Sequence, residues 1–368
     1  MRRLFVATLV TFMLIVVPRA AASAADALTI YFIDVEGGQA TLIVTPSGES
    51  LLIDTGFPSD GTFASKPGDP RSARDPQRIL AAARDAGISR IDYLMLTHYH
   101  ADHAGGVVEV AGLLPVGTFI GHAAPTADAE KAVGGTQGVY DAYVGIRPKT
   151  KHIEPKAGDH LTLNTSSVPA FSGAPISLGG GVDLVFVATE GNVMPKPVAG
   201  VTRSAAVCEG AGVPAQEKTE NPRSTAVRLQ YGRFSFLNVG DLSGPALFAL
   251  TCPANLIGDT DVYLVSHHGG DDAADPAMFK TIKPLVAILN NSSRKGAQAQ
   301  TMATLKQLPS IDTWQLHRTL NDGAENAAEE RIVNLDDTTH AWIKLVAQPD
   351  GSFVVTNGRT GVSKKYER

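Results

Sequence analysis

The chain has 368 residues, of which 32 are basic and 37 acidic, and its formal net charge is −5. This acidic balance argues against a broad nucleic-acid-binding surface, because such surfaces are strongly basic. It does not exclude a small phosphate-containing ligand, because bound cations can dominate the electrostatic field of a local site.

The N-terminal segment has the features of a secretory signal peptide. Arg2 and Arg3 provide a positive start, residues 4–17 form a short apolar run, and residues 22–24 form a small-residue cleavage site. A membrane anchor is the alternative, but the run is shorter than the roughly 20 residues that a span needs, and no other stretch comes close. We therefore expect cleavage after about Ala24. The mature protein, residues 25–368, is expected in the periplasm or the medium, with 29 basic and 37 acidic residues and a formal charge of −8.

Apolar runs bounded by turn residues alternate with helical patterns along the rest of the chain. Strands are predicted at 28–35, 40–45, 50–53, 91–96, 224–231, 233–238, 261–265, 285–289, 313–316, 341–347 and 353–356. Helices are predicted to begin at Asp75-Pro76 and Asp275-Pro276, with each aspartate as N-cap, and to cover 244–250 and 301–308. This length and alternation predict an α/β protein of one large domain or two.

Residues 121–220 are the least regular part of the chain. We expect part sheet, with strands at 161–163 and 182–188, and part inserted loops that shape a pocket. Cys208 and Cys252 are the two cysteines. In an oxidising compartment they can form a disulfide, but their spacing is equally compatible with two buried free thiols. Neither lies in a C-x-x-C motif, so neither is expected to bind a metal.

Three of the ten histidines lie in one short run, where His98, His100 and His103 combine with Asp102 in the pattern H-x-H-x-D-H. The run follows the predicted strand 91–96, and the carboxyl end of a buried strand is where open sheets present ligand-binding groups. His98 and His100 point the same way in an extended backbone, whereas Asp102 and His103 must turn to another face. The two pairs can therefore hold two metal ions side by side. These ligand types favour zinc, with manganese and iron as alternatives. A solvated polar loop is the competing interpretation.

Two further candidate ligand positions also follow apolar strands. Asp241 comes after the strand 233–238, and the pair His267-His268 comes after the strand 261–265. A carboxylate can bridge two cations, and an imidazole can complete a site. Taken singly, Asp241 is equally suited to cap the helix 244–250, and the histidine pair to be polar loop groups. Because both positions end strands, as the first run does, we expect them to converge with it into one metal centre.

These pieces, in this order, resemble the metallo-β-lactamase superfamily. The matching segments are 51–56 (L-L-I-D-T-G), the H-x-H-x-D-H run, 239–241 (V-G-D) and 266–269 (S-H-H-G). The chain is more closely similar to the branch of competence-type DNA-internalisation hydrolases, through the turn at 34–40 (D-V-E-G-G-Q-A) and the N-x-x-S element at 221–224. The resemblance implies a four-layer αββα sandwich with the metals at one edge of its two sheets.

The resemblance also implies a role for each candidate residue. His98 and His100 would hold the first metal, Asp102 and His103 the second, and Asp241 would bridge them. His267 would complete the second site, with His268 as the alternative ligand. Asp54 and Asp34 would steady the loops beneath the site. The lactamases place a third histidine on the first metal, but His122, His152 and His160 match no such motif here, and the N-x-x-S element replaces that histidine in the competence-type branch.

The expected activity is that of a secreted metal-dependent hydrolase. Two divalent ions lower the pKa of a shared water to near neutrality, which prepares it to attack a carbonyl or phosphoryl centre. Asp102 is expected to orient the nucleophile, and His268 or Tyr99 to supply a proton or hydrogen bond. The predicted substrate is a small molecule with an ester, lactone, amide or phosphodiester bond. Cleavage of β-lactams is an alternative that the missing histidine weakens. A non-catalytic exported binding protein is another, which the intact ligand set disfavours.

Overall fold

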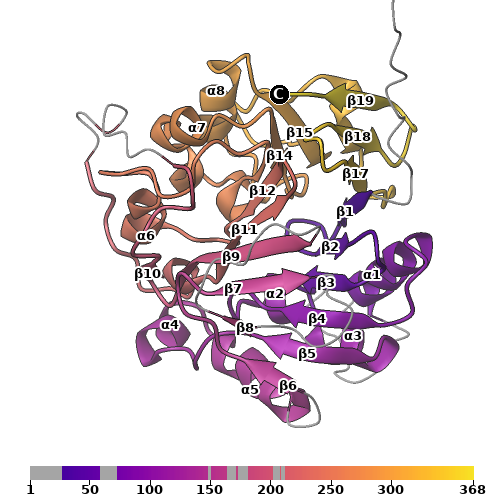
Figure 1. Cartoon of the computed structure of the whole chain (residues 1–368), viewed down its shortest axis with the longest axis vertical. Coiled ribbons are helices and arrows are strands. Elements are labelled where there is room, and N and C mark those ends of the chain that lie inside the picture. Colours follow the sequence, from indigo (N-terminus) through magenta and orange to yellow (C-terminus); the bar gives the residue numbers. More distant parts are fainter. Residues whose placement is uncertain are drawn as a thin grey trace, which may run out of the picture.

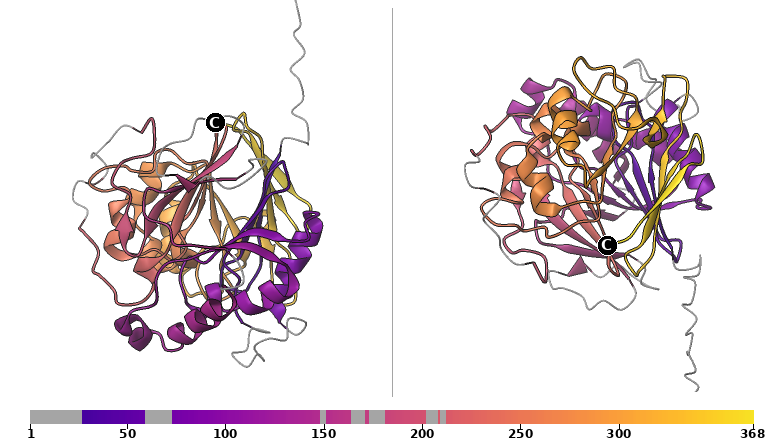
Figure 2. Two further views of the ribbon diagram at one scale, coloured as in Figure 1. Left: turned by 60° about the horizontal axis from the view of Figure 1, so that its bottom comes forward. Right: turned by 90° about the horizontal axis from the view of Figure 1, so that it is seen from above.

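The computed structural model describes residues 27–58, 73–147, 151–163, 171–172, 181–201, 208 and 212–368. The expected signal peptide, residues 1–24, lies outside these residues. Within them, two β-sheets pack face to face, and helices cover the outer face of each (Figures 1 and 2). The predicted αββα sandwich is therefore confirmed.

The first sheet has nine strands and joins the two ends of the described chain. Its strands, in spatial order, are β19 (Ser363–Tyr366), β18 (Phe353–Asn357), β17 (Ile343–Ala347), β1 (Leu28–Phe32), β2 (Thr41–Val44), β3 (Ser50–Ile53), β4 (Ile91–Met95), β5 (Val116–Ile120) and β6 (Lys151–Ile153). Strands β3 to β6 run parallel, so their carboxyl ends meet at one edge of the sheet.

Within the described residues, the second sheet has ten strands and repeats this arrangement with different segments. Its strands, in spatial order, are β16 (Ile332–Asn334), β15 (Asp312–His317), β14 (Val286–Leu289), β13 (Val262–Leu264), β12 (Phe234–Asn238), β11 (Ala226–Tyr231), β9 (Val182–Thr189), β7 (His160–Leu163) and β8 (Phe171–Ser172), and β10 (Asn192–Val193) pairs with β9. Strands β12 to β16 are parallel, so this sheet also gathers strand ends at one edge.

Three apolar layers hold the sandwich together. The central layer lies between the sheets, where the rings of Phe32 and Phe236 meet edge to face with centroids 5.6 Å apart. The outer layers pack each sheet against its helices: α1 (Arg74–Asp85), α3 (Val107–Leu113) and α5 (Thr136–Ile146) on the first sheet, and α6 (Gly244–Ala249), α7 (Pro276–Ile282) and α8 (Ala299–Lys306) on the second. Where both faces of a sheet are covered, its strands lack a polar face, and β1 is apolar at almost every position.

The two aspartate–proline helix starts behave differently. At α7, Asp275 is the N-cap, and its side chain accepts a hydrogen bond from the amide of Ala277. At α1 the prediction was wrong, because the helix begins at Arg74 and has Ala73 as its N-cap. The carboxylate of Asp75 instead accepts from the amide of Phe57 at 2.8 Å and from Arg74 Nε at 2.6 Å. It therefore fastens the residues after β3 to the helix.

The sequence did not predict several of the helices and strands. The strands predicted at 161–163 and 182–188 are present as β7 and β9, but the same interval also contains α4 (Ala127–Ala132) and α5. Glycines at 138 and 145 and several β-branched residues give α5 a weak helical pattern. Strand β19 was missed because its three exposed residues hide its pattern, and only Tyr366 reaches the core, where it stacks on Phe353.

The two cysteines form a disulfide. Cys208 is bonded to Cys252, and their Cα atoms lie 5.7 Å apart. The spacing was compatible with a disulfide or with two free thiols, and the structure has the disulfide. It ties the long segment before the N-x-x-S element to the residues that follow α6.

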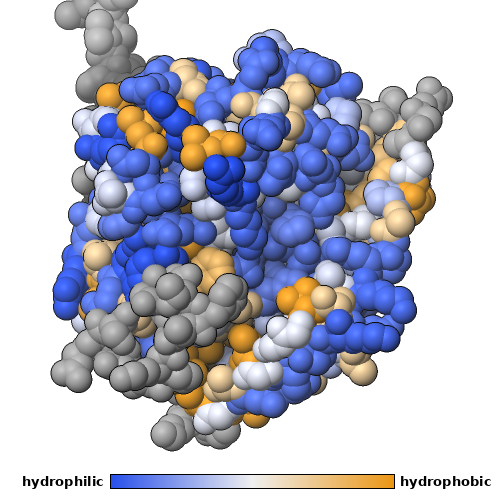
Figure 3. All heavy atoms as spheres, turned by 180° about the vertical axis from the view of Figure 1, so that it is seen from behind, coloured by the Kyte–Doolittle hydropathy of each residue, from blue (hydrophilic) through white to orange (hydrophobic). Residues whose placement is uncertain are grey.

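No helix within the described ranges is long and apolar enough to cross a membrane. On the face shown in Figure 3, hydrophilic residues dominate the described surface, and hydrophobic residues gather only in small groups.

Candidate metal centre

The candidate ligands all follow the carboxyl ends of parallel strands. His98 and His100 lie after β4, and Asp102 and His103 are in the short helix α2 (Ala101–Ala104) that begins there. From the second sheet, Asp241 follows β12, and His267 and His268 follow β13. The sandwich thus brings residues more than a hundred positions apart to one edge, as the strand-end pattern predicted.

Four of these side chains face one another with the spacing of a metal-ligand set. They are Asp102, His103, Asp241 and His268, all buried. His103 Nε2 lies 3.4 Å from Asp102 Oδ2, 3.1 Å from Asp241 Oδ2 and 3.2 Å from His268 Nε2. His268 Nε2 lies 3.3 Å from both carboxylate oxygens. Ligand atoms at about 2.0–2.1 Å from a tetrahedral ion are about 3.3–3.4 Å apart, so this set fits a zinc-sized cation.

The other two histidines of the run lie beside this set. His98 Nε2 is 3.0 Å from His100 Nδ1 and 4.0 Å from Asp241 Oδ2. Asp241 Oδ2 therefore faces both groups, and its buried Oδ1 has no hydrogen-bond partner within the described chain. A bridging carboxylate needs this arrangement, and the donor types suit a second divalent cation between His98, His100 and Asp241.

The structure places His268, rather than His267, in the four-residue set. His267 directs Nδ1 to Asp272 Oδ2 at 2.7 Å, while its Nε2 remains 3.8 Å from Asp241 Oδ2. Its side chain is 31% exposed, whereas that of His268 is buried. Both residues have positive φ angles, 49° and 57°, so the turn after β13 sends the two rings in different directions.

Burial and charge set the protonation of these groups. Burial lowers the pKa of His100 to about 4, and burial together with His103 and His100 lowers the pKa of His98 well below its usual value. Both rings are therefore neutral near pH 7 and have lone pairs to offer. Burial raises the pKa of Asp241, but His103 and His268 outweigh it and hold that pKa well below its usual value, so this carboxylate carries a negative charge.

The pKa of His103 is shifted in the opposite direction. Burial lowers its pKa, but Asp241 and Asp102 raise it well above the usual value. The two carboxylates thus attract positive charge to this position. A bound metal cation would supply that charge in place of the proton, because a ligating imidazole is neutral.

Close backbone approaches fix the loops that carry the ligands. A Cβ atom on Gly38 would lie 2.2 Å from the carbonyl oxygen of Asp102, and one on Gly240 would lie 2.8 Å from the Cβ of Thr97. The amide of Gln39 also donates to the Asp102 carbonyl at 3.0 Å. The glycines at these two positions let the 34–40 turn and the end of β12 pack directly against the histidine run.

Asp54 supports the histidine run from beneath, as the resemblance implied. Its fully buried carboxylate accepts from the amide of Thr97 at 2.7 Å and from the Thr97 hydroxyl at 2.7 Å. Its Oδ2 lies 2.8 Å from His103 Nδ1, which orients His103 Nε2 toward Asp241. Carboxylates in this position fix the ring and raise its basicity as a ligand.

Replacing Asp54 with asparagine is therefore expected to weaken metal binding by about 10- to 100-fold, because the amide is a weaker acceptor for His103. Competition titrations with a zinc chelator measure this change. Asp92→Asn is a matched control, since Asp92 holds Ser50 at the far end of β3. Equal zinc affinity in Asp54→Asn and the unaltered protein would show that Asp54 does not support the ligand.

The N-x-x-S element also reaches this edge. Asn221 Nδ2 lies 3.5 Å from His267 Nε2, and Asn221 Oδ1 is buried without a partner among the described residues. Ser224 Oγ lies 3.4 Å from His98 Nδ1. Neither His152, beside Arg147, nor His160, paired with Asp183, joins the cluster.

Two other residues considered from the sequence point away from the centre. Tyr99 is fully buried, and its hydroxyl donates to the carbonyl of His122, so it is not placed to assist a reaction. Asp34 Oδ1 pairs with His317 Nε2 at 2.7 Å, and Arg78 contacts its other oxygen at 3.2 Å. Asp34, Glu36 and His340 form a second group of possible ligands, but the Arg78 guanidinium contacts all three, and Arg74 also pairs with Glu36.

Sequence reasoning missed Lys295. Its Nζ donates to Asp102 Oδ2, the oxygen that also faces His103 and His268. This lysine follows β14, in a segment with no recognisable motif.

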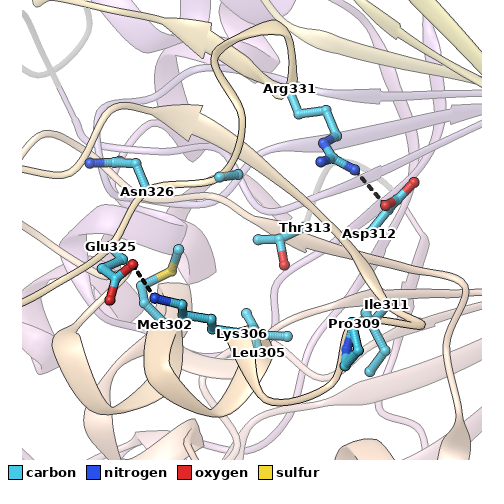
Figure 4. Close-up of a pocket in the computed structure, with 11 residues that line it drawn as sticks. Met302, Leu305, Lys306, Pro309, Ile311, Asp312, Thr313, Glu325, Asn326 and Arg331 are labelled. Atoms are coloured by element: carbon cyan, nitrogen blue, oxygen red, sulfur yellow. Dashed lines mark hydrogen bonds and ion pairs between the residues drawn. The ribbon is translucent and has the colours of Figure 1, made fainter.

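A cavity of about 320 Å³ lies elsewhere, between α8 and the segment 325–331 (Figure 4). Ion pairs between Arg331 and Asp312 and between Lys306 and Glu325 lie along it. Asp312 begins β15, so the cavity lies at the amino end of the parallel strands, away from the metal ligands.

The match to known families agrees with this geometry. Residues 33–280 match the family model described as the metallo-beta-lactamase superfamily. The chain belongs to the metallo-beta-lactamase superfamily. The two-sheet fold and the His/Asp cluster agree with this membership.

The solved structures that are similar to this chain are distant from it in sequence. A variant of a metallo-beta-lactamase from Cronobacter sakazakii is 18% identical over 57% of this chain and 60% of its own, with a TM-score of 0.31. A diphosphatase of the PhnP family is 14% identical over 78% and 94%, with a TM-score of 0.39. The subclass B3 enzyme MEM-A1, from a soil metagenome library, is 15% identical over 68% and 79%, with a TM-score of 0.34. No curated protein matches the chain. The family model therefore carries the assignment.

Proposed function

We propose that this protein is an exported hydrolase with two divalent ions, preferably zinc, which cleaves an ester, lactone or phosphodiester bond of a small substrate. The single observation that carries the proposal is the convergence of Asp102, His103, Asp241 and His268 at ligand spacing, with His98 and His100 beside them. Two bound ions would make a water nucleophilic near neutral pH and polarise the bond under attack.

The chain's own residues divide the remaining work. Asp241 presents one oxygen to both ligand groups, and Asp54 keeps His103 turned toward it. His98 and His100 stay neutral through burial, and Asp102 orients the nucleophile from the edge of the cluster. We propose His268 as a ligand, since its Nε2 lies within the four-residue set, and His267, beside Asn221, as a group facing the substrate.

We further propose membership of the competence-type branch. Support comes from Asn221 and Ser224, which lie beside His267 and His98 where no third histidine is present among the described residues. The acidic sequence favours a small substrate over an extended nucleic acid. The signal-like N-terminus and the disulfide favour export to the periplasm or the medium.

The test combines metal analysis with a substrate screen. Protein purified without chelator is analysed for metals, then assayed with chromogenic phosphodiesters, lactones and cephalosporins, with and without added zinc or manganese. We expect hydrolysis of at least one ester class, loss of activity with chelator and recovery with metal. His100→Ala is expected to lose most of this activity. His160→Ala, which changes a histidine paired with Asp183 on β7, is expected to keep it. Activity insensitive to both chelation and His100→Ala would rule out the proposed function.

A further inference from the structure

A lysine lies directly beside the metal ligands. The side chain of Lys295 reaches Asp102 and donates from Nζ to Oδ2. That oxygen is one of the four atoms with tetrahedral spacing, so a metal cation and the lysine ammonium compete for it. The side chain is also 42% exposed, so the ammonium group can be reached from solvent.

The backbone of Lys295 is held in place by a tight turn. Ser292 accepts from the amide of Lys295 through Oγ at 2.9 Å, and its own amide donates to the Lys295 carbonyl at 2.9 Å. Gly37 leaves room for the side chain, since a Cβ there would lie 3.0 Å from the Cβ of Lys295. The ammonium also lies 5.9 Å from the centre of the Phe57 ring. These contacts place the Lys295 side chain so that it extends toward Asp102.

The same turn is fastened to the second sheet's ligands. The amide of Ala297 donates to the carbonyl of His268 at 2.9 Å, and a Cβ on Gly296 would lie 2.2 Å from that carbonyl oxygen. Lys295 thus shares a rigid frame with His268 on one side and the 34–40 turn on the other. The backbone of Lys295 is therefore fixed on the same frame as His268.

Charge pairing explains what this lysine is suited to bind. The nearby Arg74 and Arg78 are engaged by Glu36, at 2.6 and 2.8 Å. The partner of Lys295, by contrast, is an oxygen that the metal set also uses. If a metal cation binds Asp102 Oδ2, the Lys295 ammonium loses part of this negatively charged partner. An incoming phosphate or carboxylate group of the substrate would provide another.

We propose that Lys295 binds an anionic oxygen of the substrate beside the metal centre, which makes anionic esters, and phosphodiesters above all, the preferred class. This inference rests on the proposed hydrolase function and narrows its substrate. Lys295 is a specificity-determining residue in this role. A neutral ester offers it no charged partner.

The test compares Lys295→Met with Arg294→Met in zinc-loaded protein. Arg294 is the exposed neighbour, so its replacement removes the same charge one residue away. In Lys295→Met, we expect KM for bis(4-nitrophenyl) phosphate to rise about 10- to 100-fold, the loss typical of a hydrogen bond to a charged group. KM for neutral 4-nitrophenyl acetate is expected to change less than about twofold. Arg294→Met is expected to match the unaltered protein with both substrates, and Lys295→Arg to keep part of the phosphate affinity.

A binding measurement separates this inference from the activity. Calorimetric titration with inorganic phosphate is expected to give a Kd at least about 10-fold higher for Lys295→Met than for Arg294→Met, with equal zinc content. If no probe substrate is hydrolysed, the proposed function fails while this titration still tests Lys295. Equal phosphate affinity in the two variants, equal losses with neutral and anionic substrates, or loss of zinc in Lys295→Met would each overturn the inference.

Discussion

Replacing Asp241 with alanine is expected to reduce zinc affinity by more than about 100-fold and to abolish hydrolysis. Changes to residues that merely support a ligand cost about 10- to 100-fold, and Asp241 faces both ligand groups itself. Its Oδ2 lies within 4.0 Å of His98 Nε2 and 3.1 Å of His103 Nε2. Without this carboxylate, the group around His98 and the group around His103 no longer share a negatively charged ligand.

Inductively coupled plasma mass spectrometry on dialysed protein measures the zinc content. Asp183→Ala is the matched control, because it removes a half-buried carboxylate that pairs with His160, a histidine outside the cluster. Unfolding curves recorded with excess chelator show whether both variants remain folded. An unchanged zinc content in Asp241→Ala would mean that the metal binds elsewhere.

Removing the disulfide is expected to lower the free energy of unfolding by about 4 kcal/mol. The bond links residues separated by 44 positions, and the chain-entropy model assigns a loop of this size roughly that stabilisation. The expectation concerns the double variant Cys208→Ser/Cys252→Ser, measured by urea unfolding at equal protein concentration.

A reductant provides the internal control for this prediction. Dithiothreitol is expected to bring the unaltered protein close to the double variant and to leave the double variant unchanged. A difference below about 1 kcal/mol between the oxidised protein and the double variant would show that the cross-link adds little to the fold.

The strand ends made much of the site predictable. The H-x-H-x-D-H run, Asp241 and the His267-His268 pair each follow an apolar strand, and parallel strands gather such ends at one edge. Asp54 was also within reach, since it follows β3 in a segment that matched the family pattern. Periodicity and residue type indicated the strand ends locally, and the family resemblance implied the supporting role of Asp54.

Other features depend on geometry that no local pattern records. The left-handed backbone of His267 and His268 decides which ring joins the ligand set, and residue type is identical at the two positions. Lys295 approaches Asp102 across 193 residues, through a turn with no motif. Asp75 had the pattern of an N-cap, yet the amide of Phe57 and the guanidinium of Arg74 take its carboxylate. Each of these features depends on contacts between residues that are far apart in the sequence.

The most direct measurement is anomalous X-ray diffraction at the zinc edge from crystals grown with zinc. We predict two anomalous peaks about 3.5–4 Å apart on either side of Asp241. One is expected among Asp102, His103 and His268, and the other beside His98 and His100. Zinc bound only at other residues, or no peak between the two sheet edges, would contradict the metal centre described for this protein.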